Sequence, residues 1–373
     1  MRFGTPALRG VLAGSFNKRW LADVIVDGNR VIADAPIVNP QFTEDATSLV
    51  QGSGSCTIVW QDDFGASVAP DQIGDWFAPF GTVIAISVVV TVGDGFVERI
   101  PFGQFLIAET PSTITTTFAY KGATLSKGDR IDLNLKDLFY GVQRDRFDTP
   151  GAAPDLSSVW AEYQRLLGFP VTVPASVPDA AIPTSVAYQE DKLQACYDLA
   201  AVLDATCYMT ADGTGSMRPN VWPAPVDTLK WGDGGTLLSF DRALANDNVY
   251  NKVVIRSTAG DGSAILGMAE ISDGPLRTHN ADGSLSPYRR VPYFYSSDYI
   301  TTTGAASKYA QTLLPRVSKL RSVIVTLTEA FNPLREVGDV LTIIRQSETL
   351  LGRVTQINRD SSGSQQTVVV VNQ

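Results

Sequence analysis

Residues Trp20 to Ala33 read WLADVIVDGNRVIA, and this stretch decides the class of the fold. β-Branched and other apolar residues stand on both sides of Asp27-Gly28, where glycine supplies the positive φ that closes a tight hairpin turn. The stretch therefore predicts two antiparallel strands and makes a β-rich fold the starting point.

The rest of residues 1–150 continues this pattern. Strands are expected where β-branched and aromatic residues gather between turn residues. They cover Ser55–Trp60, Val83–Val92, Phe96–Ile100, Gln104–Glu109, Ile114–Tyr120 and Ile131–Leu138, with Gly93-Asp94-Gly95 turning a second hairpin. Residues 1–150 are predicted to form a β-barrel-like domain.

The middle of the chain changes to a helical period. Apolar residues of 155–168 share one helical face, with Asp155 as the expected N-cap and Gly168 as the stop. A proline-studded loop follows, and then a second helix is expected over 190–204, before a hairpin. Residues 151–235 are predicted to form a small α+β module.

Residues 236–373 return mainly to strands. A hairpin is expected around Gly260-Asp261-Gly262, and a helix is expected over about 304–320, kinked or ended by Pro315. Four further strands follow in succession, over Ser322–Glu329, Asp339–Gln346, Leu350–Asn358 and Thr367–Val371. Such a succession predicts a C-terminal barrel with an inserted helix. The predicted fold class is therefore β-rich α+β, with two β-barrel-like domains and a small helix-hairpin module between them.

The charge balance argues against a protein that binds DNA or RNA. The net charge is −9, and a protein that binds DNA or RNA specifically needs clustered Lys and Arg to neutralise phosphates. Only 18% of the residues are charged, which favours a surface covered by neighbours. No transmembrane or signal-peptide stretch stands out, so we expect synthesis in the cytoplasm without membrane insertion. The three cysteines, Cys56, Cys196 and Cys207, indicate buried apolar roles.

Residues that carry chemistry are scarce. The one histidine, His279, lies in a polar stretch that predicts an exposed loop, and no Cys/His cluster has zinc-site spacing. The Asp-Gly pairs lack the alternating oxygens of a calcium loop and are interpreted as turns. The carboxylate pair of a glycosidase could come from any of the 39 acidic residues, so a hydrolase stays an alternative. We predict no enzyme, and no catalytic, cofactor-binding or metal-binding residue.

Aromatic residues crowd together around two arginines in the C-terminal part. Aromatics with Arg are typical of protein interfaces, but the same residues could pack under their own barrel. Both interpretations stay open. The predicted interface residues are Arg289, Arg290, Tyr293, Phe294, Tyr295 and Tyr299.

The order of motifs in the C-terminal part resembles the hub proteins of phage tails. The stretches that carry this resemblance are the strand at Asn246–Ile255, then Arg289–Tyr295, an Ala/Leu helix and Pro333–Leu341. The N-terminal part is similar to the first hub domain of minor tail proteins, through Val24–Gly28, Pro79–Gly81 and Pro101–Phe105. In this interpretation Gly338-Asp339 forms the structural turn that leads into a barrel strand.

The resemblance implies a structural ring at the tail tip of a virion. Three copies with two barrels each would match a hexameric tail tube to a three-fold tip. The implied partners are a distal tail protein, the tail tube protein, the tape-measure protein and tip fibres or a spike. DNA would pass without specific binding, along a lumen that we expect to be acidic. The alternatives are a receptor- or carbohydrate-binding tail protein and a cell-wall hydrolase.

Overall fold

The computed structural model describes residues 1–61, 64–93, 95–184, 186–242, 249–258, 264–296, 302–318, 323–345 and 348–372. The chain divides into two compact units, each defined by contacts among its own residues. The first unit comprises Met1–Asp241 with Thr326–Val369, and the second comprises Arg242–Val325 with Val370–Gln373. The last strands, within Thr326–Val369, group with the first 241 residues. The three domains expected over 1–150, 151–235 and 236–373 stay a prediction.

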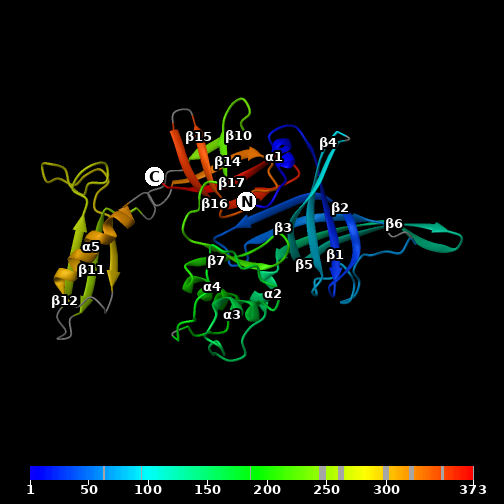
Figure 1. Cartoon of the computed structure of the whole chain (residues 1–373), viewed down its shortest axis with the longest axis horizontal. Helices are drawn as coiled ribbons and strands as arrows, with labels where there is room; N and C mark the ends of the chain where they lie inside the picture. Colours follow the sequence, from blue (N-terminus) through cyan, green and yellow to red (C-terminus); the bar gives the residue numbers. More distant parts are fainter. Residues whose placement is uncertain are drawn as a thin grey trace. The chain divides into compact units, whose positions relative to one another are not determined.

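Six strands of the first unit pair in a closed cycle (Figure 1). Each neighbouring pair is antiparallel, and the cycle runs β1-β4-β5-β6-β3-β2 and returns to β1. These strands are β1 Asn17–Val26, β2 Asn29–Asp45, β3 Gly52–Trp60, β4 Val83–Val92, β5 Phe96–Tyr120 and β6 Ala123–Asp137. The short helix α1, Pro6–Leu12, precedes them.

The predicted hairpin at the start of the cycle is confirmed. Asp27 and Gly28 have φ values of 49° and 77°, the paired positive angles of a tight hairpin turn. Inside the cycle, Trp20 contacts Phe42 and Phe102 with ring centroids 5.3 and 4.9 Å apart. Gly54 lets β3 approach these rings, because a Cβ there would lie 2.2 Å from Phe42.

A second group of strands extends the same sheet. It contains β9 Asp227–Lys230, β10 Leu237–Arg242, β14 Val323–Ala330, β15 Val340–Arg345, β16 Glu348–Arg359 and β17 Ser364–Asn372. Their order is β10-β14-β17-β16-β15-β9, and the end of β16 also pairs with β2, opposite Phe42–Asp45. The result is one twelve-stranded sheet, so the β-rich prediction is confirmed.

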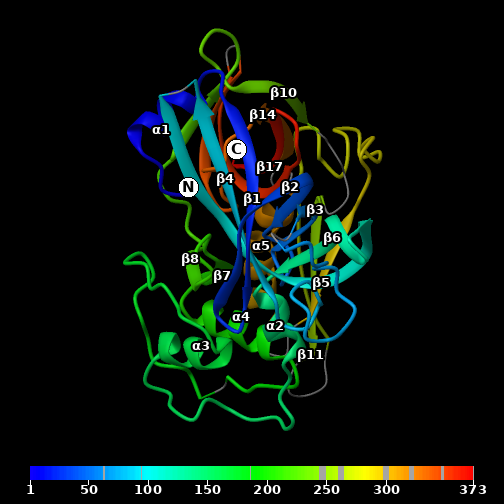
Figure 2. The same ribbon diagram turned by 90° about the vertical axis from the view of Figure 1, so that its right-hand side faces the viewer.

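Three helices gather at one end of the first unit (Figure 2). They are α2 Phe139–Arg144, α3 Val159–Leu167 and α4 Lys192–Val202, followed by the hairpin of β7 Ala205–Met209 and β8 Gly215–Pro219. Ser158 caps α3 by accepting from the Ala161 N–H, so the predicted cap at Asp155 is wrong. Asp155 instead accepts from the Ser157 N–H at 2.8 Å, in a turn that precedes the helix. The stop at Gly168 is confirmed by its left-handed φ of 74°.

The second unit is a small sheet covered by one helix. Its strands β11 Lys252–Thr258, β12 Ala264–Glu270 and β13 Pro292–Ser296 pair in the order β12-β11-β13. Helix α5, Thr303–Ser318, packs on them through Ala306, Ala310 and Val317. The helix continues through Pro315 instead of ending there. The predicted turn at 260–262 lies outside the described residues.

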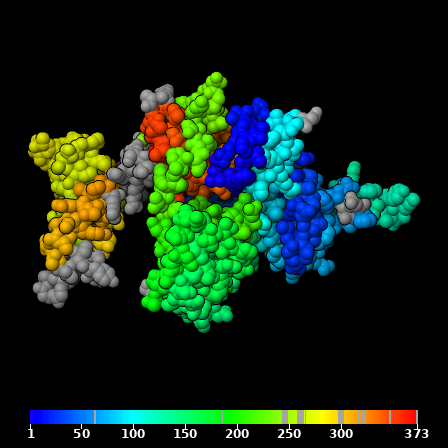
Figure 3. Space-filling view, viewed as in Figure 1, coloured from blue at the N-terminus to red at the C-terminus, as the bar shows by residue number. Residues whose placement is uncertain are grey.

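The end of the β5–β6 hairpin differs from the rest of the first unit. Its strands continue past the core as a two-stranded ribbon, which projects from the space-filling surface (Figure 3). All residues of 111–124 are exposed.

Candidate functional site

The predicted aromatic cluster is divided by the alternation of β13. Tyr293 and Tyr295 are half-buried against the core of the second unit. Tyr293 contacts the Tyr250 ring at 5.2 Å, and Tyr295 contacts the Tyr309 ring at the same distance. These two tyrosines therefore pack within their own unit.

Other members of the cluster face outward. Phe294 is 53% exposed, and the Arg256 guanidinium lies 4.3 Å from its ring centroid. Arg289 and Arg290 are exposed, and Arg289 has a φ of 63°. Tyr299 lies outside the described residues. A role of this surface in binding stays a prediction.

The Gly338-Asp339 turn is tied to strand β16. Gly338 donates its N–H to the Val354 carbonyl, and Val354 returns the bond to the Asp339 carbonyl, both at 2.8 Å. Gly338 has a φ of 92°, which side chains other than hydrogen rarely allow. The Asp339 carboxylate accepts from the N–H of Glu336, three residues earlier, and from the Met1 ammonium group. Burial raises the pKa of Asp339, although the Met1 charge opposes this.

A buried ion pair that the sequence analysis missed lies next to this turn. Arg335 and Glu329 are 0% and 1% exposed. The Arg335 Nε and Nη2 atoms donate to the two Glu329 carboxylate oxygens at 3.2 and 2.7 Å. Gln365 and Thr367 donate to the same carboxylate at 2.9 and 2.7 Å. A buried carboxylate is stabilised by such a set of hydrogen-bond donors.

A second, half-buried carboxylate joins three distant segments. Glu44 on β2 accepts from Arg2 at 2.8 Å and from Arg359 on β16 at 2.7 Å. Burial on its own would raise the pKa of Glu44, but the two guanidinium charges outweigh burial and hold this pKa at about 2. The charged group thereby reinforces the junction where β2 pairs with β16.

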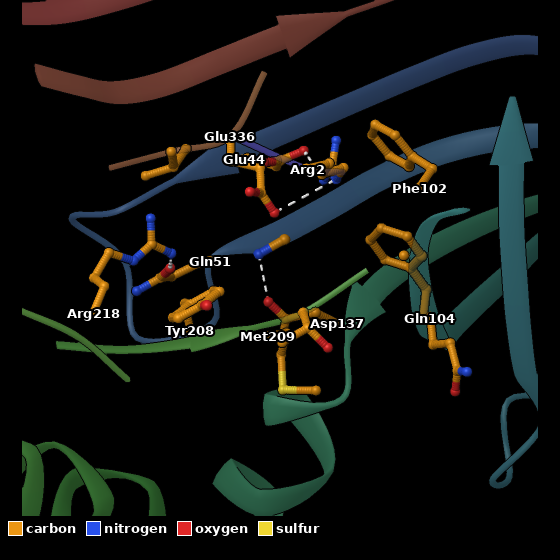
Figure 4. A pocket seen from close by; sticks show the side chains of 15 residues that line it. Arg2, Glu44, Gln51, Phe102, Gln104, Asp137, Tyr208, Met209, Arg218 and Glu336 are labelled. Atoms are coloured by element: carbon orange, nitrogen blue, oxygen red, sulfur yellow. Dashed lines mark hydrogen bonds and ion pairs between the residues drawn. The ribbon is translucent and has the colours of Figure 1, made fainter. Parts of the chain in front are cut away.

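A small cavity of about 50 Å³ opens beside Glu44 (Figure 4). Its lining comes from the strand cycle, the helical module and the Gly338 turn. The polar side chains that face it include Arg2, Glu44, Gln51, Asp137, Arg218 and Glu336.

Asp137 is the most perturbed acid in this lining. It is 4% exposed and accepts from the backbone N–H groups of Gly52 and Phe139. Burial raises the pKa of Asp137 to about 7, although these N–H groups favour the ionised form.

Arg218 lies across the cavity from Asp137. Its guanidinium lies 4.1 Å from the Tyr208 ring centroid and donates to Gln51 at 3.4 Å. Burial lowers the pKa of Arg218.

The lining of the cavity contains no histidine, cysteine or serine, and the described part of the chain holds no His/Cys/Asp/Glu group suited to a metal ion. The polar side chains of the lining connect the strand cycle, the helical module and the Gly338 turn. We call the set of Arg2, Glu44, Gln51, Asp137, Arg218 and Glu336, with Arg359 bound to Glu44, the polar joint.

The Asp137 proton predicts a pH-dependent stability. Between about pH 4 and pH 7 the folded chain keeps this proton, whereas the unfolded chain, with its ordinary pKa of about 3.9, releases it. The free energy of unfolding should fall as pH rises through this window, by up to about 1.4 kcal/mol per pH unit. Urea unfolding at a series of pH values measures the slope.

The matched variants are Asp137→Asn and Asp132→Asn, both on β6. Asp137→Asn should be less stable than the wild type. Its free energy of unfolding should lack the fall with pH that Asp137 causes, because no carboxyl group remains at position 137 to titrate. Asp132→Asn should keep this fall. An unchanged slope in Asp137→Asn would contradict the raised pKa.

The three cysteines and His279, the other residues that could carry chemistry, are buried or half-buried in the fold. All three cysteines are buried and unpaired. His279 is half-buried, more covered than predicted, with its Nδ1 atom 3.1 Å from the Thr278 hydroxyl. Within the described residues, no helix has the length and apolar character needed to cross a membrane.

Solved structures with a similar fold include two tail proteins. The tail protein from Neisseria meningitidis superposes with a TM-score of 0.54 at 15% identity, over 95% of this chain and 96% of that one. The 43 kDa tail protein of prophage MuSo2 from Shewanella oneidensis also gives 0.54, at 13% identity, over 95% and 98%. The chain has a phage tail protein fold. No protein-family model and no curated protein sequence matches it.

This tail protein fold agrees with the family that the sequence motifs resemble. The sites described above add detail to it. The Glu44 ion pairs and the cavity lie where the strand cycle, the helical module and the C-terminal strands of the tail protein fold meet.

Proposed function

We propose that this chain is a hub or minor tail protein, a structural component of a phage virion. The observation that carries the proposal is the similarity of its fold to two tail proteins over nearly the whole length of all three chains. In the proposed assembly, copies of the chain form a ring that joins the tail tube to the distal tip and lets the genome pass. The chain acts without catalysis.

The ring is a homotrimer in this proposal. Each chain contributes two β-barrel-like units, so three chains present six similar units to a hexameric tube. The closed strand cycle supports the first of these units, and the β2–β16 pairing supports a fixed placement of the C-terminal strands beside it. The partners are the distal tail protein, the tail tube protein, the tape-measure protein and tip fibres or a spike.

The proposal predicts the mass of the assembly. The purified chain, at rising concentration, should approach three times its 40.1 kDa monomer mass in light scattering. Electron microscopy of the particle should place it at the tail tip with three-fold symmetry. A position in the capsid, or single copies at the tail, would contradict the proposal.

A receptor-binding role is the second candidate, and exposed Phe294 favours it. This ring is 53% exposed with Arg256 beside it, the combination found at binding hot spots. Phe294→Ala should abolish binding to host cells if this candidate is right. The control is Leu285→Ala, an exposed apolar residue of the same unit.

A further inference from the structure

The end of the β5–β6 hairpin is a ribbon without cover in the single chain. Lys121 and Gly122 turn it with φ values of 48° and 82°, and both strands of 111–124 are exposed. An isolated two-stranded ribbon is marginally stable in water. Such a ribbon gains stability when its exposed face is covered by another surface.

One face of the tip is apolar. Ile114, Phe118 and Tyr120 alternate along β5 and so point to the same side, with exposures of 55%, 44% and 54%. Phe118 pairs across the ribbon with Leu125. Exposed apolar side chains on one face of a projecting ribbon, here interrupted by Thr116, are typical of a contact surface.

The tip is also basic, unlike the chain as a whole. The exposed tip, residues 111–124, contains one charged side chain, the cation Lys121, in a chain with a net charge of −9. Asp129 is buried and accepts from Ser67 and from the Val68 N–H. The exposed charge of the tip is therefore positive, and it fits an acidic apolar surface.

A surface of that kind lies beside the same hairpin, next to Thr115 and Asp129. The loop 66–76 forms a hollow of about 370 Å³. Trp76, which is 39% exposed, lines this hollow with Asp71 and Asp75. Ile73 of the same loop is 72% exposed outside the lining. The stretch 64–81 contains no lysine or arginine.

The loop is held in place by the hairpin itself. Ser67 contacts the Thr115 hydroxyl at 3.2 Å, and the Val68 N–H donates to Asp129 at 2.7 Å. Each chain thus carries a basic apolar tip and, beside the same hairpin, an acidic loop with exposed apolar side chains.

We propose that the hairpin tip of one chain docks into the 66–76 loop of a second copy of this chain. Phe118 and Tyr120 bury against Ile73 and Trp76, and Lys121 pairs with Asp71. Such a contact joins unlike surfaces, and its repetition closes into a ring when the rotation between copies allows it. The inference rests on the proposed ring-forming function and names the surfaces that build the ring.

Cross-linking between two single variants tests the contact. The native cysteines are buried, so an introduced thiol is the exposed one. A mixture of Tyr120→Cys and Ile73→Cys chains should give a disulfide-linked dimer on a non-reducing gel. A mixture of Tyr120→Cys with Val173→Cys, at an exposed site outside both surfaces, is the control. Equal dimer in both mixtures, or none in either, would overturn the proposal.

Association measurements separate this inference from the function on which it rests. Phe118→Ser/Tyr120→Ser should weaken self-association about 100-fold with an unchanged melting temperature, whereas Val173→Ser should leave it unchanged. Lys121→Glu should weaken it about 2–5-fold, and Lys121→Glu/Asp71→Lys should restore it. A trimer that the double serine variant leaves intact overturns the hairpin contact but not the hub. A monomeric wild-type chain, together with its absence from a tail-tip ring, overturns both.

Discussion

Replacing Glu329 by leucine is expected to lower the free energy of unfolding by about 3–5 kcal/mol. The Arg335 guanidinium is 0% exposed and donates two hydrogen bonds to this carboxylate, so the variant leaves a buried positive charge without its main partner. Gln365 and Thr367 lose an acceptor at the same time. Unfolding in urea, followed by circular dichroism, measures the loss.

A double variant separates the charge from the packing. Glu329→Leu/Arg335→Met removes both members of the pair and keeps apolar volume, so it should recover most of the stability. The matched surface control is Glu270→Leu, whose partner Lys252 is solvent-accessible, and it should change stability by less than about 1 kcal/mol. A loss as small as this control in Glu329→Leu would show that the buried pair contributes little.

Gly338→Val is expected to destabilise the first unit by about 3 kcal/mol or more. The φ of 92° strains any β-branched residue. A Cβ at this position would also lie 2.4 Å from the Arg218 Nη1 atom. Arg218 cannot move freely, because it packs on Tyr208 and donates to Gln51. Thermal and urea unfolding of the variant measure the effect.

Two further variants separate the backbone strain at Gly338 from the steric clash with Arg218. Gly232→Val has a similar φ of 85° with open space around it, so it should show the strain alone, about 1–2 kcal/mol. In an Arg218→Ala background, Gly338→Val should cost less than in the wild type, because the steric part is absent. A wild-type melting curve for Gly338→Val would contradict the tight turn at this position.

The strands and helices of this chain follow from local sequence. Alternation and turn residues predicted the Asp27-Gly28 hairpin and β4, and helical periodicity predicted α4, because these signals act over a few residues. The start of α3 was misplaced since both Asp155 and Ser158 are good caps, and only the folded backbone selects Ser158.

The ion pairs of Glu44 in the polar joint could not be predicted from local sequence patterns. Glu44, Arg2 and Arg359 are far apart in the sequence, and each looks like an ordinary surface charge on a strand or at a terminus. Their meeting depends on the pairing of β2 with β16, a tertiary contact that no local pattern encodes. The division of Tyr293, Phe294 and Tyr295 between two faces follows from strand alternation, but which face is covered depends on the placement of α5.

The pairing of β2 with β16 also bears on how the nascent chain reaches its final form. Glu44 and Arg359 are 315 residues apart, so the edge of β2 leaves the ribosome long before its partner is made. An unpaired strand edge recruits other strands, and late long-range closure slows folding. Host chaperones that shield this edge during translation should therefore raise the yield of soluble chain.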